Sequence, residues 1–147
     1  MEINKSNIKY KEWRSTEDMH EDTLNAISEL RFINDEQQFL EDLIKNYTID
    51  LIAEDTFTKS REVISSLSMH RKDLKPLLKK TMTHSNMLQT LLDDDEIPGE
   101  IERYKEEHHN LMVEVVAYYT KFKRVKRKIF SLVQKIIKHK KQKKLLC

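Results

Sequence analysis

The chain has 147 residues, with one glycine, two prolines and one cysteine, and 35% of its residues are charged. Sheets and loop-rich folds need more glycine and proline for their turns, so this composition excludes them and favours a single domain of long helices. The lone Cys147 excludes an internal disulfide, and one glycine is too few for a glycine-rich phosphate-binding loop.

The charge is distributed unevenly along the chain. The last 27 residues carry twelve Lys or Arg and no Asp or Glu, whereas the first 120 residues carry 15 basic and 25 acidic residues. The net charge of +2 is therefore the sum of −10 in the first part and +12 in the second. A chain polarised in this way is expected to meet a partner or surface of opposite charge.

Neither a transmembrane segment nor a secretion signal is predicted. No apolar run approaches the ~18 residues that a bilayer-spanning helix needs. Residues 1–14 are polar, lack the apolar core of a signal peptide and show no helical periodicity. We therefore expect a cytoplasmic protein with an irregular segment at residues 1–14.

The first long helix is predicted from about residue 16 to residue 53. Ser15 or Thr16 is a suitable N-cap, and acidic residues follow in the first turn, where the helix dipole favours negative charge. The apolar spacing predicts an inward stripe of His20, Leu24, Ile27, Leu30, Gln37, Leu40, Ile44, Tyr47 and Leu51, widened by Ile33, Phe39 and Leu43. A break is expected within residues 46–56, because Thr48 and Ile49 are weak helix formers.

The second long helix is predicted over residues 57–92. Its inward stripe is predicted to contain Phe57, Ile64, Leu67, His70, Leu74, Leu78, Thr81, Ser85, Leu88 and Leu92. Pro76 lies inside this helix and removes one backbone hydrogen bond, so a kink or a one-turn break is expected near residues 72–76. The acidic run at residues 93–96 is expected to end the helix, and Pro98 suits the first position of the next one.

The third helix shows the clearest periodicity. Seven-residue intervals connect Ile101, His108, Val115, Phe122, Ile129 and Ile136, and a second series contains Tyr104, Leu111, Tyr118, Val125 and Leu132. This a/d heptad predicts coiled-coil packing that stops near Ile137. At ~1.5 Å per residue, the third helix is longer than the other two. We therefore predict an all-α fold, an antiparallel three-helix bundle over residues 15–137, whose third helix overhangs as a basic tail at residues 138–147.

Two Glu-x-x-His sequences raise the possibility of a metal site. Glu17 precedes His20, and Glu106 precedes His109, at the spacing that ferritin-like bundles use for metal ligands. The heptad places Glu106 and His109 on the solvated side of the third helix, and no further helix supplies a second pair of carboxylates. We therefore predict no cofactor and keep a metal-binding helical bundle as an alternative.

Two histidines, His20 and His108, fall on the predicted apolar stripes. Each is interpreted as a core or boundary residue, or else as a proton-linked switch, and Tyr104 and His84 are possible hydrogen-bond partners. If His108 is buried without a charged partner, its pKa is expected to lie below ~6.5, and stability is expected to fall at lower pH. A paired carboxylate would reverse that effect. Whether His20, His84 and His108 form one cluster is left open.

The basic region divides into two parts. Residues 121–128 are expected to pair with acidic residues of the chain, namely Glu41, Asp42, Asp50, Glu54, Asp55 and Glu62. The part beyond them is expected to have no acid within reach. The predicted binding residues are therefore Lys135, Lys138, Lys140, Lys141, Lys143 and Lys144.

The sequence shows no nucleophile, acid–base pair or oxyanion donor set, so we expect no enzymatic activity. We predict a helical interaction module that binds an acidic protein, an anionic membrane surface or a second copy of the chain through the basic end of the third helix. Non-specific nucleic-acid binding is an alternative, although the acidic remainder of the chain opposes it and no aromatic residue interleaves the terminal lysines. A solubilising tail without a partner is the remaining possibility.

Overall fold

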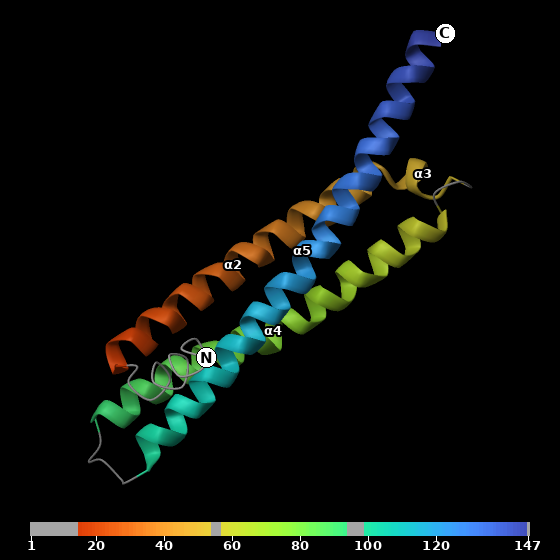
Figure 1. Ribbon diagram of the computed structural model, residues 1–147. Helices are drawn as coiled ribbons and strands as arrows, with labels where there is room; N and C mark the ends of the chain where they lie inside the picture. The colour runs from red at the N-terminus through yellow and green to blue at the C-terminus, as the bar shows by residue number, and fades with distance from the viewer. Residues whose placement is uncertain (1–14, 54–56, 94–98, 147) are drawn as a thin grey trace, which may run out of the picture. The chain divides into compact units, whose positions relative to one another are not determined.

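The computed structural model describes residues 15–53, 57–93 and 99–146. They form four helices, which are α2 (Thr16–Asn46), α3 (Thr48–Leu51), α4 (Phe57–Asp93) and α5 (Glu100–Leu146) (Figure 1). No strand occurs in these three ranges, so the all-α prediction is confirmed. None of the helices within them is both long and apolar enough to cross a membrane. The expectations for residues 1–14, for Glu54 and Asp55, and for Pro98 lie outside the described residues.

Local sequence signals explain where the helices begin and end. The Ser15 side chain accepts a hydrogen bond from the backbone N–H of Asp18 at 3.0 Å, which makes Ser15 the N-cap of α2. The expected break within residues 46–56 is confirmed at Tyr47, where α2 ends and the short α3 begins. Gly99 precedes α5 with a φ of +89°, a left-handed conformation that favours glycine.

Of the kink or one-turn break predicted near residues 72–76, the break is wrong, because α4 continues through Pro76 from Phe57 to Asp93, and the kink stays a prediction. Leu74 and Leu77, on either side of the proline, are both buried in the structure. Their burial stabilises the helical path on both sides of Pro76 and offsets the backbone hydrogen bond that the proline ring removes.

The chain divides into two compact units, and each contains a segment of every long helix. Unit 1 comprises residues 1–31 and 75–118, and unit 2 comprises residues 32–74 and 119–147. In unit 1, Met19, Leu88 and Tyr104 form a buried cluster to which α2, α4 and α5 each contribute one residue. The core of unit 2 includes Ile33, Leu40, Leu51, Val63, Leu67, Leu74, Phe122, Val125, Ile129, Leu132, Val133 and Ile136.

The predicted inward stripe is correct for most of α5. Every heptad position from Tyr104 to Ile136 is buried, and Ile136 is the last buried residue among those described. The end of core packing was expected near Ile137, whose side chain is half-buried. This stripe could be predicted from the sequence because large apolar or aromatic residues occupy nearly every inward position.

The stripe of α2 is displaced from its predicted position at its N-terminal end. His20, Leu24 and Phe39 are exposed, and Met19, Thr23 and Ala26 are buried although they were not predicted to be. The prediction is correct for Ile27, Leu30, Ile33, Gln37 and Leu40, which are all buried. The Thr23 hydroxyl donates to the carbonyl oxygen of Met19 at 2.7 Å, and this local hydrogen bond lets a polar residue occupy the core.

The α4 stripe is also partly displaced. Phe57, Ile64 and Leu92 are exposed, whereas the buried residues are Ser60, Val63, Leu67, Leu74, Leu77, Thr81, His84 and Leu88. Successive buried positions here are separated by three, four or seven residues, as on one face of a helix. Leu67, Leu74, Thr81 and Leu88 were predicted correctly, whereas Ser60 and His84 were missed, because a search for apolar residues passes over serine and histidine.

Candidate functional site

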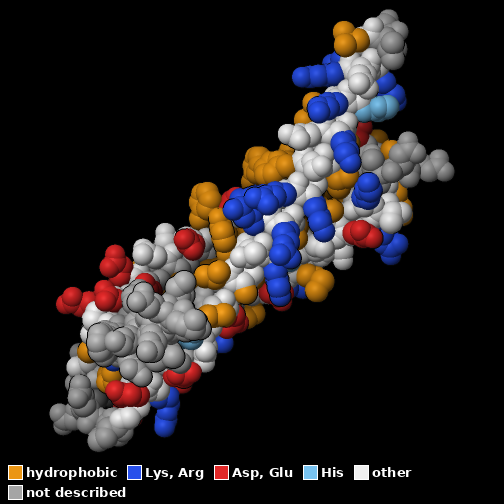
Figure 2. Space-filling model, viewed as in Figure 1, with side chains coloured by type: hydrophobic (Ala, Val, Ile, Leu, Met, Phe, Trp, Pro, Cys, Tyr) orange, Lys and Arg blue, Asp and Glu red, His pale blue; other side chains and the backbone are white. Residues whose placement is uncertain are grey.

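The predicted binding residues lie on the part of α5 that belongs to unit 2. This part contains no Asp or Glu after Tyr119, and its Lys and Arg side chains gather along the helix in Figure 2. We call Lys135, Lys138, Lys140, Lys141, Lys143 and Lys144 the terminal lysines, and all six are exposed. They form a locally cationic surface, since the helix that carries them supplies no negative charge to neutralise them.

The part of α5 from Lys121 to Lys128 was predicted to pair with a set of acidic residues that includes Glu41 and Asp42. The structure pairs Lys126 with Glu36 instead, with Nζ and Oε2 2.6 Å apart. Glu41 forms an ion pair with Arg71 of α4. Intramolecular pairing of this region is thus observed at Lys126, but with a partner that was not predicted.

The expectation that the terminal lysines have no acid within reach is wrong at Lys140. The Lys140 Nζ lies 3.0 Å from Oδ2 of Asp50 in α3 and 5.6 Å from the ring centroid of Tyr47. A hollow of about 340 Å³ adjoins this pair, and its lining includes Lys135 and Lys143. The first turn of the predicted tail therefore contacts the α2–α3 corner of unit 2. A half-exposed pair of this kind contributes only ~0–1 kcal/mol to stability.

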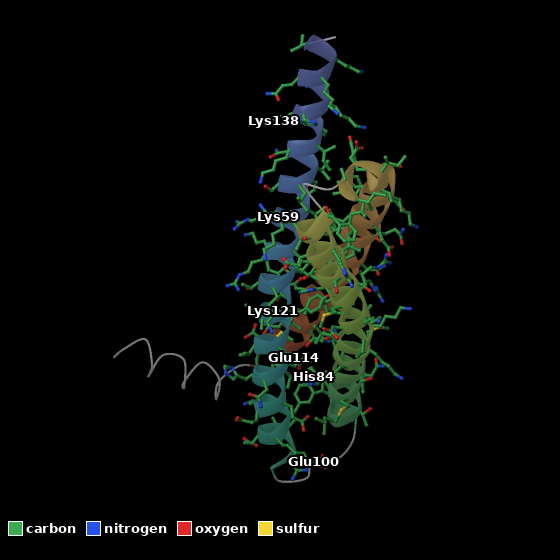
Figure 3. The ribbon with its side chains drawn as sticks, turned by 90° about the vertical axis from the view of Figure 1, so that its right-hand side faces the viewer. Lys59, His84, Glu100, Glu114, Lys121 and Lys138 are labelled. Atoms are coloured by element: carbon green, nitrogen blue, oxygen red, sulfur yellow. The ribbon has the colours of Figure 1, made fainter. Side chains whose placement is uncertain are left out.

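The remaining terminal lysines differ in their surroundings. Lys135 lines a second hollow of about 620 Å³ in unit 2, together with Lys59 and Lys128. Figure 3 labels Lys59 on α4 and Lys138 on α5. Within residues 15–53, 57–93 and 99–146, no ion pair forms at Lys138, Lys141, Lys143 or Lys144. Their charges are therefore available to an external anion.

A second polar site lies inside unit 1. His84 Nε2 is 2.9 Å from His108 Nδ1, and His108 Nε2 is 3.0 Å from Oδ2 of Asp22. The Tyr104 hydroxyl donates to the backbone oxygen of His84 at 2.8 Å, and the two rings stack with centroids 4.1 Å apart. The open question about the histidines is thus resolved in part, because His84 and His108 interact whereas His20 is exposed.

Charge and burial assign protons in this histidine cluster. An ionised Asp22 only accepts, so His108 donates to it from Nε2. Burial, together with the neighbouring His108, lowers the pKa of His84 to about 4, so His84 is neutral at neutral pH. Burial, with a smaller effect of Glu107, raises the pKa of Tyr104. Asp22 is thus a carboxylate paired with His108, so the condition of a buried His108 without a charged partner is not met.

The Glu-x-x-His sequences do not converge. Glu17 and His20 on α2, like Glu106 and His109 on α5, are all exposed. In the described part of the chain, no group of three or more His, Cys, Asp or Glu side chains is arranged to hold a metal ion. The cluster of Asp22, His84 and His108 uses its facing atoms in hydrogen bonds with one another.

The histidine cluster contributes buried hydrogen bonds to unit 1, whereas the terminal lysines present charge to the outside. The histidine cluster is therefore the better candidate for a stabilising role, and the terminal lysines are the better candidate for a binding site. A scan against models of protein families, a search of curated proteins and a search of solved structures each gave no match.

Proposed function

We propose that this chain is a non-enzymatic helical interaction module that binds an acidic protein or an anionic surface through the basic end of α5. The observation that carries this proposal is the exposure of all six terminal lysines on a helical stretch that has no acid of its own. Of the six, Lys140 is the one seen paired with an acid among the described residues. Concentrated positive charge of this kind attracts anionic partners and accelerates their association.

The architecture in this proposal is an antiparallel three-helix bundle with coiled-coil packing within each unit. In unit 2, α5 meets α2 at Lys126–Glu36 and α3 at Lys140–Asp50, and the two residues of each pair are 90 residues apart in the sequence, as expected for segments that run in the same direction. In unit 1, Lys80 of α4 pairs with Glu114 of α5, whereas His84, further along α4, meets the earlier His108. This crossing order supports an opposite direction for α4.

A binding role explains the terminal lysines better than the alternatives do. For nucleic acid, base stacking would require aromatic side chains between the lysines, and the sequence from Lys138 to Lys144 has none. In a metal-binding bundle the basic segment would have no role, because lysine is protonated at neutral pH and a protonated amine cannot bind a metal ion. The experiment below tests the nucleic-acid alternative, and elemental analysis of the purified protein tests the metal alternative.

The proposal predicts that neutralising the unpaired lysines weakens anion binding without unfolding the protein. The variant K138Q/K141Q/K143Q/K144Q is expected to bind poly-L-glutamate at least about tenfold more weakly than the native chain at ~50 mM salt, because fewer charges attract the polyanion. The matched control is K45Q/K72Q/K75Q/K79Q, which removes the same charge from four exposed lysines of α2 and α4. Fluorescence anisotropy with labelled poly-L-glutamate measures both affinities.

Two further probes distinguish the classes of partner. Vesicles containing phosphatidylserine test an anionic membrane surface, and a DNA duplex tests nucleic acid. Equal weakening by the terminal variant and by the control would show that total charge decides binding, and would contradict a specific role for the end of α5. A preference for the duplex over both other probes would favour the nucleic-acid alternative.

A further inference from the structure

An exposed aromatic patch lies beside the basic surface in unit 2. Phe32 and Phe39 on α2 are 64% and 57% exposed, and Tyr119 and Phe130 on α5 are each 40% exposed. Leu43 adds a half-buried side chain one turn beyond Phe39. We call Phe32, Phe39, Tyr119 and Phe130 the aromatic patch. Four large rings exposed on adjacent helix segments are unusual for a surface that meets only water.

The ion pair between Glu36 and Lys126 places these rings on one side of unit 2. Glu36 lies four residues after Phe32 and three before Phe39, so the three side chains share a face of α2. On α5, Lys126 lies four residues before Phe130 and seven after Tyr119, again on one face. Because the two charged groups touch at 2.6 Å, the α2 rings and the α5 rings border the same seam between the helices.

The two edges of this seam carry opposite charge. On the α5 edge, the exposed Lys123 and Arg127 lie within one turn of Tyr119 and Phe130 respectively. On the α2 edge, Asp35 lies between Phe32 and Phe39, and Asp42 follows Phe39 by three residues. The Glu36–Lys126 ion pair therefore spans the seam, and the aromatic rings border it. The α5 edge is basic, whereas the α2 edge carries the two acids Asp35 and Asp42 beside the exposed Lys45.

This arrangement selects among the classes of partner. An anionic membrane or a nucleic acid would meet the basic edge favourably, but Asp35 and Asp42 on the other edge would repel it. An amphipathic helix can satisfy both edges, since its apolar stripe is flanked by two independent rows of side chains. Acidic residues in the row facing α5 and basic residues in the other row would complement both edges.

We propose that the aromatic patch is the docking surface for one amphipathic helix of a partner protein, with acidic residues along the edge that faces α5. This inference rests on the proposed function and names the partner as a protein helix. Aromatic side chains supply large contact area at small loss of conformational freedom, and they are frequent among residues that dominate binding. The terminal lysines extend the basic edge further along α5.

The test uses a synthetic helical peptide of about four heptads, with leucine at the two apolar positions, glutamate in one flanking row and lysine in the other. A second peptide has the same composition in scrambled order. The full chain is titrated with each labelled peptide, and so are the variants F32S/F39S and I49S/M69S. The second variant is the matched control, because Ile49 and Met69 are exposed apolar residues of unit 2 outside the patch.

The native chain is expected to bind the ordered peptide, and F32S/F39S to bind it at least about tenfold more weakly, while I49S/M69S changes the affinity less than about twofold. Circular dichroism of each variant checks that the helical content is unchanged. No binding of the ordered peptide, equal binding of the scrambled one, or equal effects of the two variants would overturn the proposal. Self-association of the native chain that is lost in F32S/F39S would also overturn it, by assigning the patch to a second copy.

The same variants separate this inference from the proposed function. F32S/F39S is expected to retain native affinity for poly-L-glutamate, because it leaves every lysine in place. If the terminal-lysine variant also retains that affinity, the proposed function fails while the docking surface is still tested by the ordered peptide. If only the peptide result fails, the basic end of α5 keeps its proposed role and the aromatic patch loses its own.

Discussion

Phe122→Ala is expected to lower the free energy of unfolding by about 3–5 kcal/mol. The Phe122 side chain is 1% exposed in the core of unit 2, and its ring lies 6.4 Å from the ring of His70 on α4. Removing the ring leaves a cavity that the surrounding helices fill only in part, so contacts of both α4 and α5 are lost. Urea denaturation followed by circular dichroism measures the change.

The matched control is Phe39→Ala, because that ring is 57% exposed on α2 of the same unit. This substitution is expected to change the free energy of unfolding by less than about 1 kcal/mol, since little apolar area returns to water. If Phe122→Ala also changed it by less than about 1 kcal/mol, the packing of α5 against the other helices would be wrong.

The stability of the chain is expected to depend on pH through His84. In the folded state the pKa of His84 is lowered to about 4, whereas an unfolded histidine titrates near 6.5. Between these values the unfolded state binds the proton and the folded state does not. The contribution of His84 to stability is therefore fully present above pH ~6.5 and is lost as the pH falls toward 4. The total loss amounts to about 3 kcal/mol.

His84→Gln isolates this contribution, because glutamine keeps an N–H donor near His108 but does not titrate in this range. The native chain is expected to lose stability relative to the variant as the pH is lowered from 7 to 4, in urea denaturations performed at several pH values. The difference between the native chain and the variant is the quantity compared, because it removes the pH dependence that the two chains share. His109→Gln is the control, since His109 is exposed on α5. An NMR titration that places the pKa of His84 above 6.5 would contradict the assignment.

The helices of this chain were largely predictable, but their inward faces were predictable only in part. Large residues occupy nearly all the buried heptad positions of α5, so their spacing could be read directly. On α2 the core positions include Thr23 and Ala26, whereas Leu24 and Phe39 lie outside the core. The apolar pattern therefore misassigned these positions, although it placed Ile27, Leu30 and Leu40 correctly. Phe39, which the prediction wrongly placed inward, belongs to the proposed docking surface.

The candidate site was predictable in composition but not in its contacts. The terminal lysines could be identified from the sequence alone, because the charge of a residue follows from its type and not from the tertiary structure. The pairs Lys140–Asp50 and Lys126–Glu36 depend on the register between α2 and α5, and each residue of helix advances the register by ~1.5 Å. An error of one turn therefore changes every predicted partner. The contact of His108 with Asp22 was missed for the same reason.

The most direct test of the proposed function is the salt dependence of poly-L-glutamate binding by the full chain and by a chain that ends at Ile137. The full chain is expected to bind more weakly as salt rises from ~50 to ~200 mM, because salt screens the terminal lysines. The shortened chain is expected to bind weakly at both concentrations. Its melting temperature should be nearly unchanged, since Ile136 is the last buried residue described. Unchanged affinity and salt dependence after truncation would contradict a binding role for the end of α5.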